Sequence, residues 1–81
     1  RGVEGLEITL ANSADCWIGA YVDGQLAWEK TLTSGEQEII TANERIFLII
    51  GYPPALQLTV NGQSLPPFDT TDVFRLTLVR Q

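Results

Sequence analysis

The sequence predicts an all-β fold, a small antiparallel β-sandwich of about seven strands. Asp23-Gly24 and Asn61-Gly62 each stand between segments in which apolar and polar residues alternate, and no segment has the periodicity of a helix. Both dipeptides suit the type I′ turn, whose two central residues need positive φ, and alternation is typical of a strand with one buried face. Short strands spaced about 8 to 12 residues apart are typical of a sandwich or barrel.

The first half of the chain supplies a hairpin and the strand before it. Leu6 to Ala11 alternates regularly, which predicts a strand with one face buried. Cys16 to Val22 is apolar on both faces, with Trp17, Gly19 and Tyr21 on one of them. Such a strand needs a cover on each side or leaves an exposed apolar patch. After the Asp23-Gly24 turn, the segment from Leu26 to Leu32 predicts the antiparallel return strand.

In the second half, Arg45 to Ile50 is the stretch with the highest β-propensity, and we expect it to be a central strand. Pro53 and Pro54 end it, because neither residue can donate a hydrogen bond to a ladder. The remaining segments are a weaker strand at Glu36–Thr41, a hairpin formed by Leu56–Val60 and Ser64–Leu65, a connection at Phe68–Asp72 and a closing strand at Phe74–Val79.

Length and charge limit the classes of function. With 81 residues we expect one domain, residues 1–81, and the start at Arg1 without methionine suggests a piece excised from a longer protein. The net charge is −5 and the basic residues are scattered, which argues against nucleic acid and anionic lipid as partners. The longest apolar run, Ile46 to Ile50, is far shorter than the about 20 residues that span a bilayer.

The residue inventory argues against catalysis. The chain has no histidine, which excludes hydrolytic triads, histidine acid–base chemistry and most zinc sites. The single cysteine, Cys16, is expected to be a buried apolar side chain. Asp69 and Asp72 share one loop, but two carboxylates fall short of the ligand set that calcium needs. We therefore expect no enzyme activity, no cofactor and no metal ion.

The aromatic residues Trp17, Tyr21, Trp28 and Tyr52 are the candidate binding residues. Exposed aromatic rings offer large apolar area with a polar edge, which suits sugar rings as well as protein partners. A structural alternative is that Trp17 and Trp28 pack against each other across the hairpin.

The order of short motifs along the chain resembles the C-terminal domain of RodZ-type proteins. The likeness covers nearly the whole chain, although Tyr52-Pro53-Pro54 follows Gly51 where the family commonly has an asparagine and small residues. The residues that carry it are Asp15-Cys16-Trp17-Ile18, Asp23-Gly24, Leu32, Ser34-Gly35-Glu36, Leu48-Ile49-Ile50-Gly51 and Leu58-Thr59-Val60-Asn61-Gly62.

The resemblance implies a single-pass bacterial inner-membrane protein of the rod-shape machinery, with a cytoplasmic domain that binds the actin-like MreB, and with this β domain in the periplasm. Its expected role is that of a non-catalytic interaction module, whose partners are proteins of the cell-elongation complex or the cell wall. The membrane would be reached only through a transmembrane segment absent from this chain. The alternative is a sandwich that binds glycan or peptidoglycan through an aromatic platform.

Overall fold

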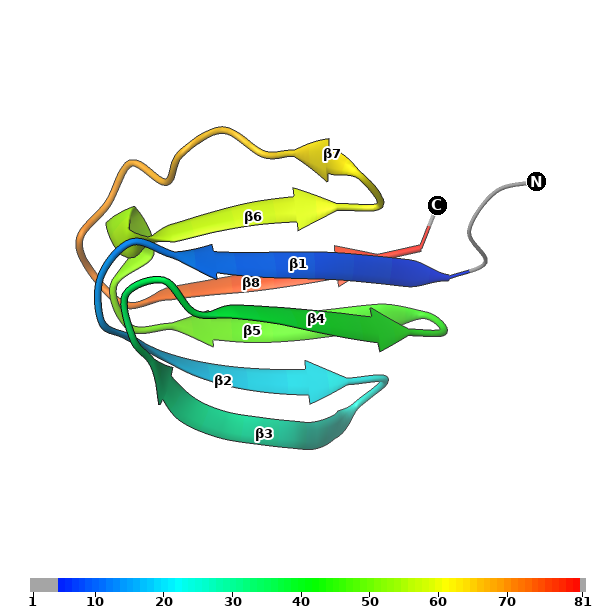
Figure 1. Cartoon of the computed structure of the whole chain (residues 1–81). Coiled ribbons are helices and arrows are strands. Elements are labelled where there is room, and N and C mark those ends of the chain that lie inside the picture. The colour runs from blue at the N-terminus through cyan, green and yellow to red at the C-terminus, as the bar shows by residue number, and fades with distance from the viewer. Residues whose placement is uncertain (1–4, 81) are drawn as a thin grey trace.

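The computed structural model describes residues 5–80, which form eight strands and one short 3-10 helix (Figure 1). The fold is all-β, as the sequence predicts. The elements are β1 (Leu6–Asn12), β2 (Cys16–Val22), β3 (Gln25–Leu32), β4 (Gln37–Ala42), β5 (Arg45–Ile50), η1 (Pro53–Ala55), β6 (Leu56–Val60), β7 (Gln63–Ser64) and β8 (Phe74–Val79).

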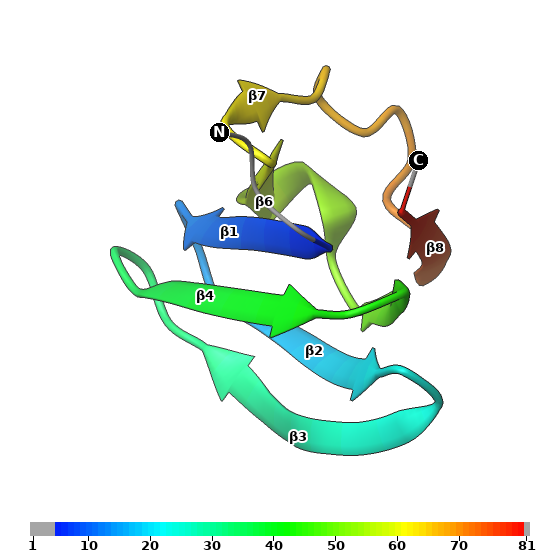
Figure 2. The ribbon, with the colours of Figure 1, turned by 90° about the vertical axis from the view of Figure 1, so that its right-hand side faces the viewer.

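The strands form two antiparallel four-stranded sheets that pack face to face (Figure 2). Sheet A has the order β4-β1-β6-β7, and sheet B has the order β3-β2-β5-β8. The hairpins β2–β3 and β6–β7 stay within one sheet, and the other connections cross between the sheets. β5 lies between β2 and β8, so the prediction of a central strand at residues 45–50 is confirmed.

The core lies between the sheets and consists of alternate residues from each inner strand, because successive side chains of a strand point to opposite faces. Cys16 belongs to it with an exposed fraction of 2%, as expected. The buried side chains include Leu6, Ile8 and Leu10 of β1, Ile18 and Ala20 of β2, and Ile46, Leu48 and Ile50 of β5.

Both predicted hairpin turns are present. The φ angles are 51° at Asp23 and 87° at Gly24, and 48° at Asn61 and 85° at Gly62. Positive φ at both central residues is the requirement of the type I′ turn, which explains why these dipeptides mark the hairpins.

The strand count is eight where the sequence suggests about seven, because the return strand β7 contains only Gln63 and Ser64. Pro66 and Pro67 follow shortly after and cannot donate to a ladder. The long connection from β7 to β8 therefore crosses to sheet B without extending sheet A.

Candidate functional site

The outer faces of the two sheets differ in chemistry. The register of sheet A places mainly polar residues outward: Glu7, Thr9, Ala11, Gln37, Ile39, Thr41, Gln57 and Thr59. The register of sheet B places six large apolar side chains outward, beside polar ones such as Glu29, Thr31 and Thr77. We call these six the apolar face: Trp17, Tyr21, Leu26, Phe47, Ile49 and Val79. The strand that is apolar on both faces, β2, thus has one face in the core and the other on the surface.

Tyr21 lies at the centre of the apolar face. It is paired with Leu26 on one side and with Phe47 on the other. The rings of Tyr21 and Phe47 are tilted against each other with centroids 5.7 Å apart. Around them Trp17, Leu26 and Val79 are exposed by 39%, 52% and 54%. Contiguous exposed apolar side chains of this kind are typical of an interaction surface.

A β-bulge shapes this face. The β2–β3 register shifts between Ala20 and Tyr21, so that Tyr21 pairs with Leu26 and Ala27 has no partner on β2. Without the shift, Ala27 would stand opposite Tyr21. The bulge therefore adds a leucine to the apolar face where the regular register would supply an alanine.

Two glycines position Trp17. A Cβ atom at Gly19 would lie 3.2 Å from Cη2 of Trp17, so the indole ring lies over Gly19. Directly after the neighbouring strand β5, the N–H of Gly51 donates a 2.7 Å hydrogen bond to the carbonyl oxygen of Trp17. A Cβ at Gly51 would meet that same oxygen at 3.1 Å. Because Gly19 has no side chain, the indole of Trp17 can lie along the sheet. Because Gly51 has none, the end of β5 can approach the backbone of Trp17.

The other two aromatic candidates lie elsewhere. Trp28 is paired with Ala20 and faces inward, where Lys30 Nζ lies 5.1 Å from the centroid of its ring. Because Trp17 is paired with Thr31 and faces outward, the alternative that the two tryptophans pack across the hairpin is wrong. Tyr52 is 44% exposed and follows β5, at the Trp17 end of the sandwich.

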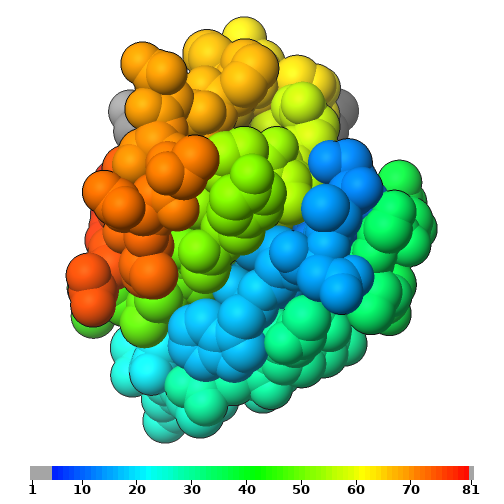
Figure 3. All heavy atoms as spheres, turned by 90° about the vertical axis from the view of Figure 1, so that its left-hand side faces the viewer, coloured from blue at the N-terminus to red at the C-terminus, as the bar shows by residue number. Residues whose placement is uncertain are grey.

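Tyr52 marks the end of the molecule where most connections meet. Its backbone N–H donates to Cys16 Sγ at 3.4 Å, and Cys16 Sγ lies 3.4 Å from its carbonyl oxygen. Figure 3 shows this end, where the β1–β2 and β3–β4 connections, η1 and the β7–β8 connection are packed together. Pro53 and Pro54 begin the short 3-10 turn η1 here.

Phe47 and Ile49 were not among the sequence candidates. The signal that points to them is the uninterrupted apolar run from Ile46 to Ile50 in β5, since a run of five apolar residues in a strand must be apolar on both faces. Leu26 carries no such signal, because its position depends on the bulge.

Basic side chains border the apolar face. Arg45 is paired with Val79, and Arg75 is paired with Ile49, so both arginines point to the same side as the apolar residues. The ion pairs found among residues 5–80 are Lys30–Glu38 and Arg80–Glu44, and neither involves these two arginines. On the β5 and β8 side the apolar face is therefore bordered by these two arginines, whereas on the β3 side Glu29 lies on the same outer face, opposite Gly19.

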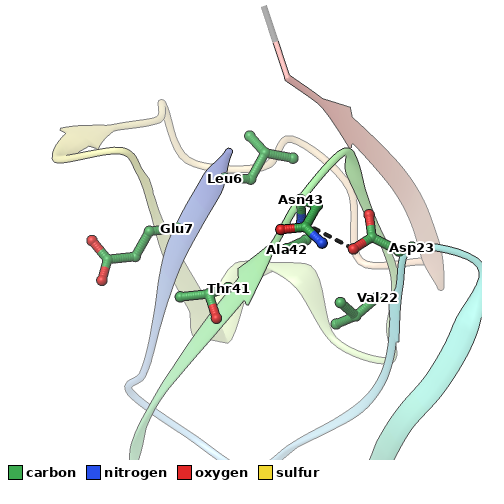
Figure 4. Close-up of a pocket in the computed structure, with 7 residues that line it drawn as sticks. All are labelled: Leu6, Glu7, Val22, Asp23, Thr41, Ala42 and Asn43. Carbon is green, nitrogen blue, oxygen red and sulfur yellow. Dashed lines mark hydrogen bonds between the residues drawn. The ribbon is translucent and has the colours of Figure 1, made fainter. Parts of the chain in front are cut away.

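A hollow lies at the opposite end of the sandwich (Figure 4). It is lined by residues of β1, β2, β4 and the β2–β3 and β4–β5 turns, among them Val22, Asp23 and Asn43. The carboxylate of Asp23 accepts hydrogen bonds from the backbone N–H groups of Asn43 at 2.9 Å, Glu44 at 2.8 Å and Arg45 at 3.0 Å. These bonds, that from Asn43 first, lower the pKa of Asp23. Both oxygens are thus engaged in closing the turn.

Glu36 likewise stabilises a turn, in the connection between β3 and β4. Its Oε1 accepts hydrogen bonds from the backbone N–H of Thr33 at 2.6 Å and from the Thr33 hydroxyl at 3.0 Å, and these bonds lower its pKa. Within residues 5–80, no cluster of three or more histidine, cysteine or acidic side chains is arranged to bind a metal ion. Nor does this part of the chain contain a helix long and apolar enough to span a bilayer.

The sequence profile of the RodZ C-terminal domain matches residues 9–77, from β1 into β8. The chain belongs to this family. The resemblance inferred from the ordered motifs is thereby confirmed. Searches of curated proteins and of solved structures gave no significant match. In this RodZ C-terminal domain, the matched region includes the whole apolar face except Val79.

Proposed function

We propose that this RodZ C-terminal domain is a non-catalytic interaction module of a bacterial cell-shape protein. In this proposal it lies in the periplasm and links the MreB-associated elongation machinery to proteins of the elongation complex or to the cell wall. The family membership supports the assignment to a RodZ-like protein. The observation that carries the interaction role is the contrast between the apolar face of sheet B and the polar outer face of sheet A.

Two of the carboxylates, Asp23 and Glu36, have structural tasks, which supports a role for them without catalysis. A general acid or base at neutral pH needs a pKa near the working pH and a free oxygen within reach of a substrate. The pKa values of Asp23 and Glu36 are lowered instead, and backbone hydrogen bonds that close turns engage both oxygens of Asp23 and Oε1 of Glu36. Both groups stabilise the fold and are poorly suited to proton transfer.

The interaction role is tested with a matched pair of surface variants in the full-length protein. Leu26→Gln changes the apolar face, and Ile39→Gln changes an apolar side chain on the outer face of sheet A that is exposed somewhat more, by 64% against 52%. We expect Leu26→Gln, alone or with Trp17→Gln, to reduce the recovery of elongation-complex proteins after cross-linking and to give rounder cells. Ile39→Gln should leave both unchanged. Normal shape and normal recovery with Leu26→Gln and Trp17→Gln combined would contradict the proposal.

The location is tested separately with an alkaline phosphatase fused after the domain, because this enzyme is active only outside the cytoplasm, where its disulfides form. We expect an active fusion in the full-length protein. An inactive fusion at normal expression would contradict a periplasmic domain without affecting the apolar face.

Glycan binding is a second candidate, favoured by Trp17, whose indole lies over Gly19 and is 39% exposed. A ring in this position offers a sugar an apolar stacking surface. In a Trp28→Phe variant, Trp17 is the remaining tryptophan, so its fluorescence reports directly on the site. Titration with peptidoglycan fragments should give a saturable change if the candidate is right, and no change at millimolar ligand rules it out.

A further inference from the structure

Four edge strands border the two sheets, and three of them have features that disfavour pairing with another chain. β3 carries the bulge opposite Ala20 and Tyr21, and its Lys30 faces inward opposite Ile18. β4 carries the inward-facing Glu38, whose Oε2 lies 2.6 Å from Lys30 Nζ. β7 has only two residues. Bulges, inward charges and short length each prevent a further strand from adding to an edge.

β8 lacks all three features. It has six residues, it pairs with β5 in an unbroken register, and it contains no proline. Its inward-facing residues Phe74, Leu76 and Leu78 are apolar and only half-buried. Within residues 5–80, β8 pairs with β5 alone, and it lies at the margin of the molecule (Figure 2).

The backbone of β8 offers regularly spaced hydrogen-bonding groups to a further strand. The N–H of Arg80 donates to the carbonyl oxygen of Glu44 on the β5 side at 2.8 Å. Backbone groups alternate in direction along a strand, so the even-numbered residues of β8 point to β5. The N–H and C=O groups of Arg75, Thr77 and Val79 therefore point away from the sheet.

We propose that β8 pairs with β8 of a second copy of this chain, antiparallel and with the two-fold axis at Leu76. In this register Arg75 stands opposite Thr77 of the other copy, and their outward N–H and C=O groups meet in hydrogen-bonded pairs. The side chains are also compatible: Phe74 stands opposite Leu78, a pair that occurs twice by symmetry. Where the pairing continues past both ends of β8, Asp72 stands opposite Arg80.

Charge complementarity selects this register over its neighbours. An axis at Arg75 would place two arginines directly opposite each other, which is destabilising. An axis at Thr77 would place Phe74 opposite Arg80. With the axis at Leu76, the acidic residue before β8 meets the basic residue after it, and the half-buried inward leucines of both copies become neighbours.

The dimer goes beyond the interaction role proposed above. It joins the two B sheets into one continuous sheet, because each β8 is the last strand of its sheet B. The apolar faces of both copies then lie on the same side of that sheet, since residues paired across a ladder share a face. The assembled surface presents two copies of the apolar face to a partner.

The first test compares two proline variants by sedimentation of the 81-residue chain at concentrations up to about 1 mM, the weak end of specific association. The N–H of Thr77 points to the free edge, so Thr77→Pro removes a dimer hydrogen bond and no bond within the monomer. Thr31→Pro is the matched control. Thr31 stands opposite Trp17, whose carbonyl oxygen is bonded to Gly51, so its N–H also points away from sheet B.

We expect the wild-type chain and Thr31→Pro to be dimers at the upper concentrations and Thr77→Pro to have half their mass, with native circular dichroism spectra throughout. A wild-type chain that stays monomeric overturns the proposal and leaves the edge to a strand of another protein. A Thr77→Pro variant that remains dimeric also overturns it, because the contact then lies elsewhere.

The second test addresses the register. Asp72→Arg and Arg80→Asp each place like charges opposite each other and should weaken the dimer, whereas the double variant restores opposite charges and should regain wild-type affinity. The Arg80–Glu44 ion pair lost in the second variant is exposed and contributes little to folding. Single variants without effect, or a double variant no better than either one, contradict the axis at Leu76.

Discussion

Asn61 and Glu7 are joined by two hydrogen bonds, one in each direction. The N–H of Asn61 donates to the carbonyl oxygen of Glu7 at 2.7 Å, and the N–H of Glu7 donates to Asn61 Oδ1 at 2.7 Å. The turn of the β6–β7 hairpin thus extends the pairing of β6 with β1 by one residue. Asn61 combines two properties, tolerance of positive φ and a side-chain acceptor, which explains why asparagine suits this position.

Asn61→Gly separates these two properties. Glycine accepts positive φ but offers no acceptor to the N–H of Glu7, so the free energy of unfolding should fall by about 1 kcal/mol. Asn61→Asp keeps an oxygen at the same position and should stay within about 0.5 kcal/mol of wild type. Denaturant unfolding measures both. Equal stability of Asn61→Gly and Asn61→Asp would show that the side-chain bond contributes nothing.

Asp23 should make the domain less stable in acid. Its pKa is lowered from the ordinary 3.8 by the backbone N–H groups of Asn43, Arg45 and Glu44. Because the folded-state pKa lies below the unfolded value, the contribution is fully present above the unfolded pKa and is lost as the pH falls through the folded pKa. The free energy of unfolding should therefore decrease as the pH drops below about 4.

Asp23→Asn tests the origin of this pH dependence, since asparagine tolerates positive φ and keeps one acceptor but does not titrate. The slope of stability against pH in acid should become smaller than in wild type. Glu36 acts in the same direction through Thr33, so the double variant with Glu36→Gln should have the smallest slope. An unchanged slope in Asp23→Asn would contradict the assignment.

Gly24 should be sensitive to side-chain shape. At φ 87°, a β-branched residue is strained, and Gly24→Val should lower the free energy of unfolding by about 1 kcal/mol or more. The nearest atom to an added Cβ is Arg45 Nη2 at 3.6 Å, an ordinary contact, so the loss arises from the backbone and not from crowding. Gly24→Asn should therefore lose less. Denaturation midpoints equal to wild type in Gly24→Val would contradict the type I′ turn.

Gly19 and Gly51 offer a matched pair around Trp17. An added Cβ meets the mobile end of the indole at Gly19 but the backbone oxygen of Trp17 at Gly51. Gly19→Ala should change the Trp17 fluorescence in a Trp28→Phe background, with stability within about 0.5 kcal/mol. Gly51→Ala should lower stability by about 1–3 kcal/mol, because β5 must shift against β2. The opposite order of stabilities would contradict the placement of the indole over Gly19.

Most strands could be predicted because their signals are local. The turns at Asp23-Gly24 and Asn61-Gly62 depend on the φ preferences of those residues alone, and the alternation in β1 and β6 depends on neighbours along the chain. β7 is harder to assign, because a strand of two residues has no periodicity and exists only through its pairing with β6.

The candidate site was only partly predictable, because part of it depends on how the strands pair with one another. That β2 has a second apolar face follows from its sequence, but the orientation of Trp28 depends on its register against Ala20. Leu26 joins Tyr21 only because a bulge removes Ala27 from the ladder. Register and bulges are set by contacts between strands, which alternation within one strand does not encode.

The sequence by itself determined the all-β class, both hairpin turns, the central position of β5 and, through its ordered motifs, the RodZ family. The tertiary structure alone decided that large apolar side chains gather on the outer face of sheet B while the outer face of sheet A is mainly polar, and that β8 is the unprotected edge. These properties belong to neighbouring strands far apart in sequence, so they arise only when the register of every ladder is in place.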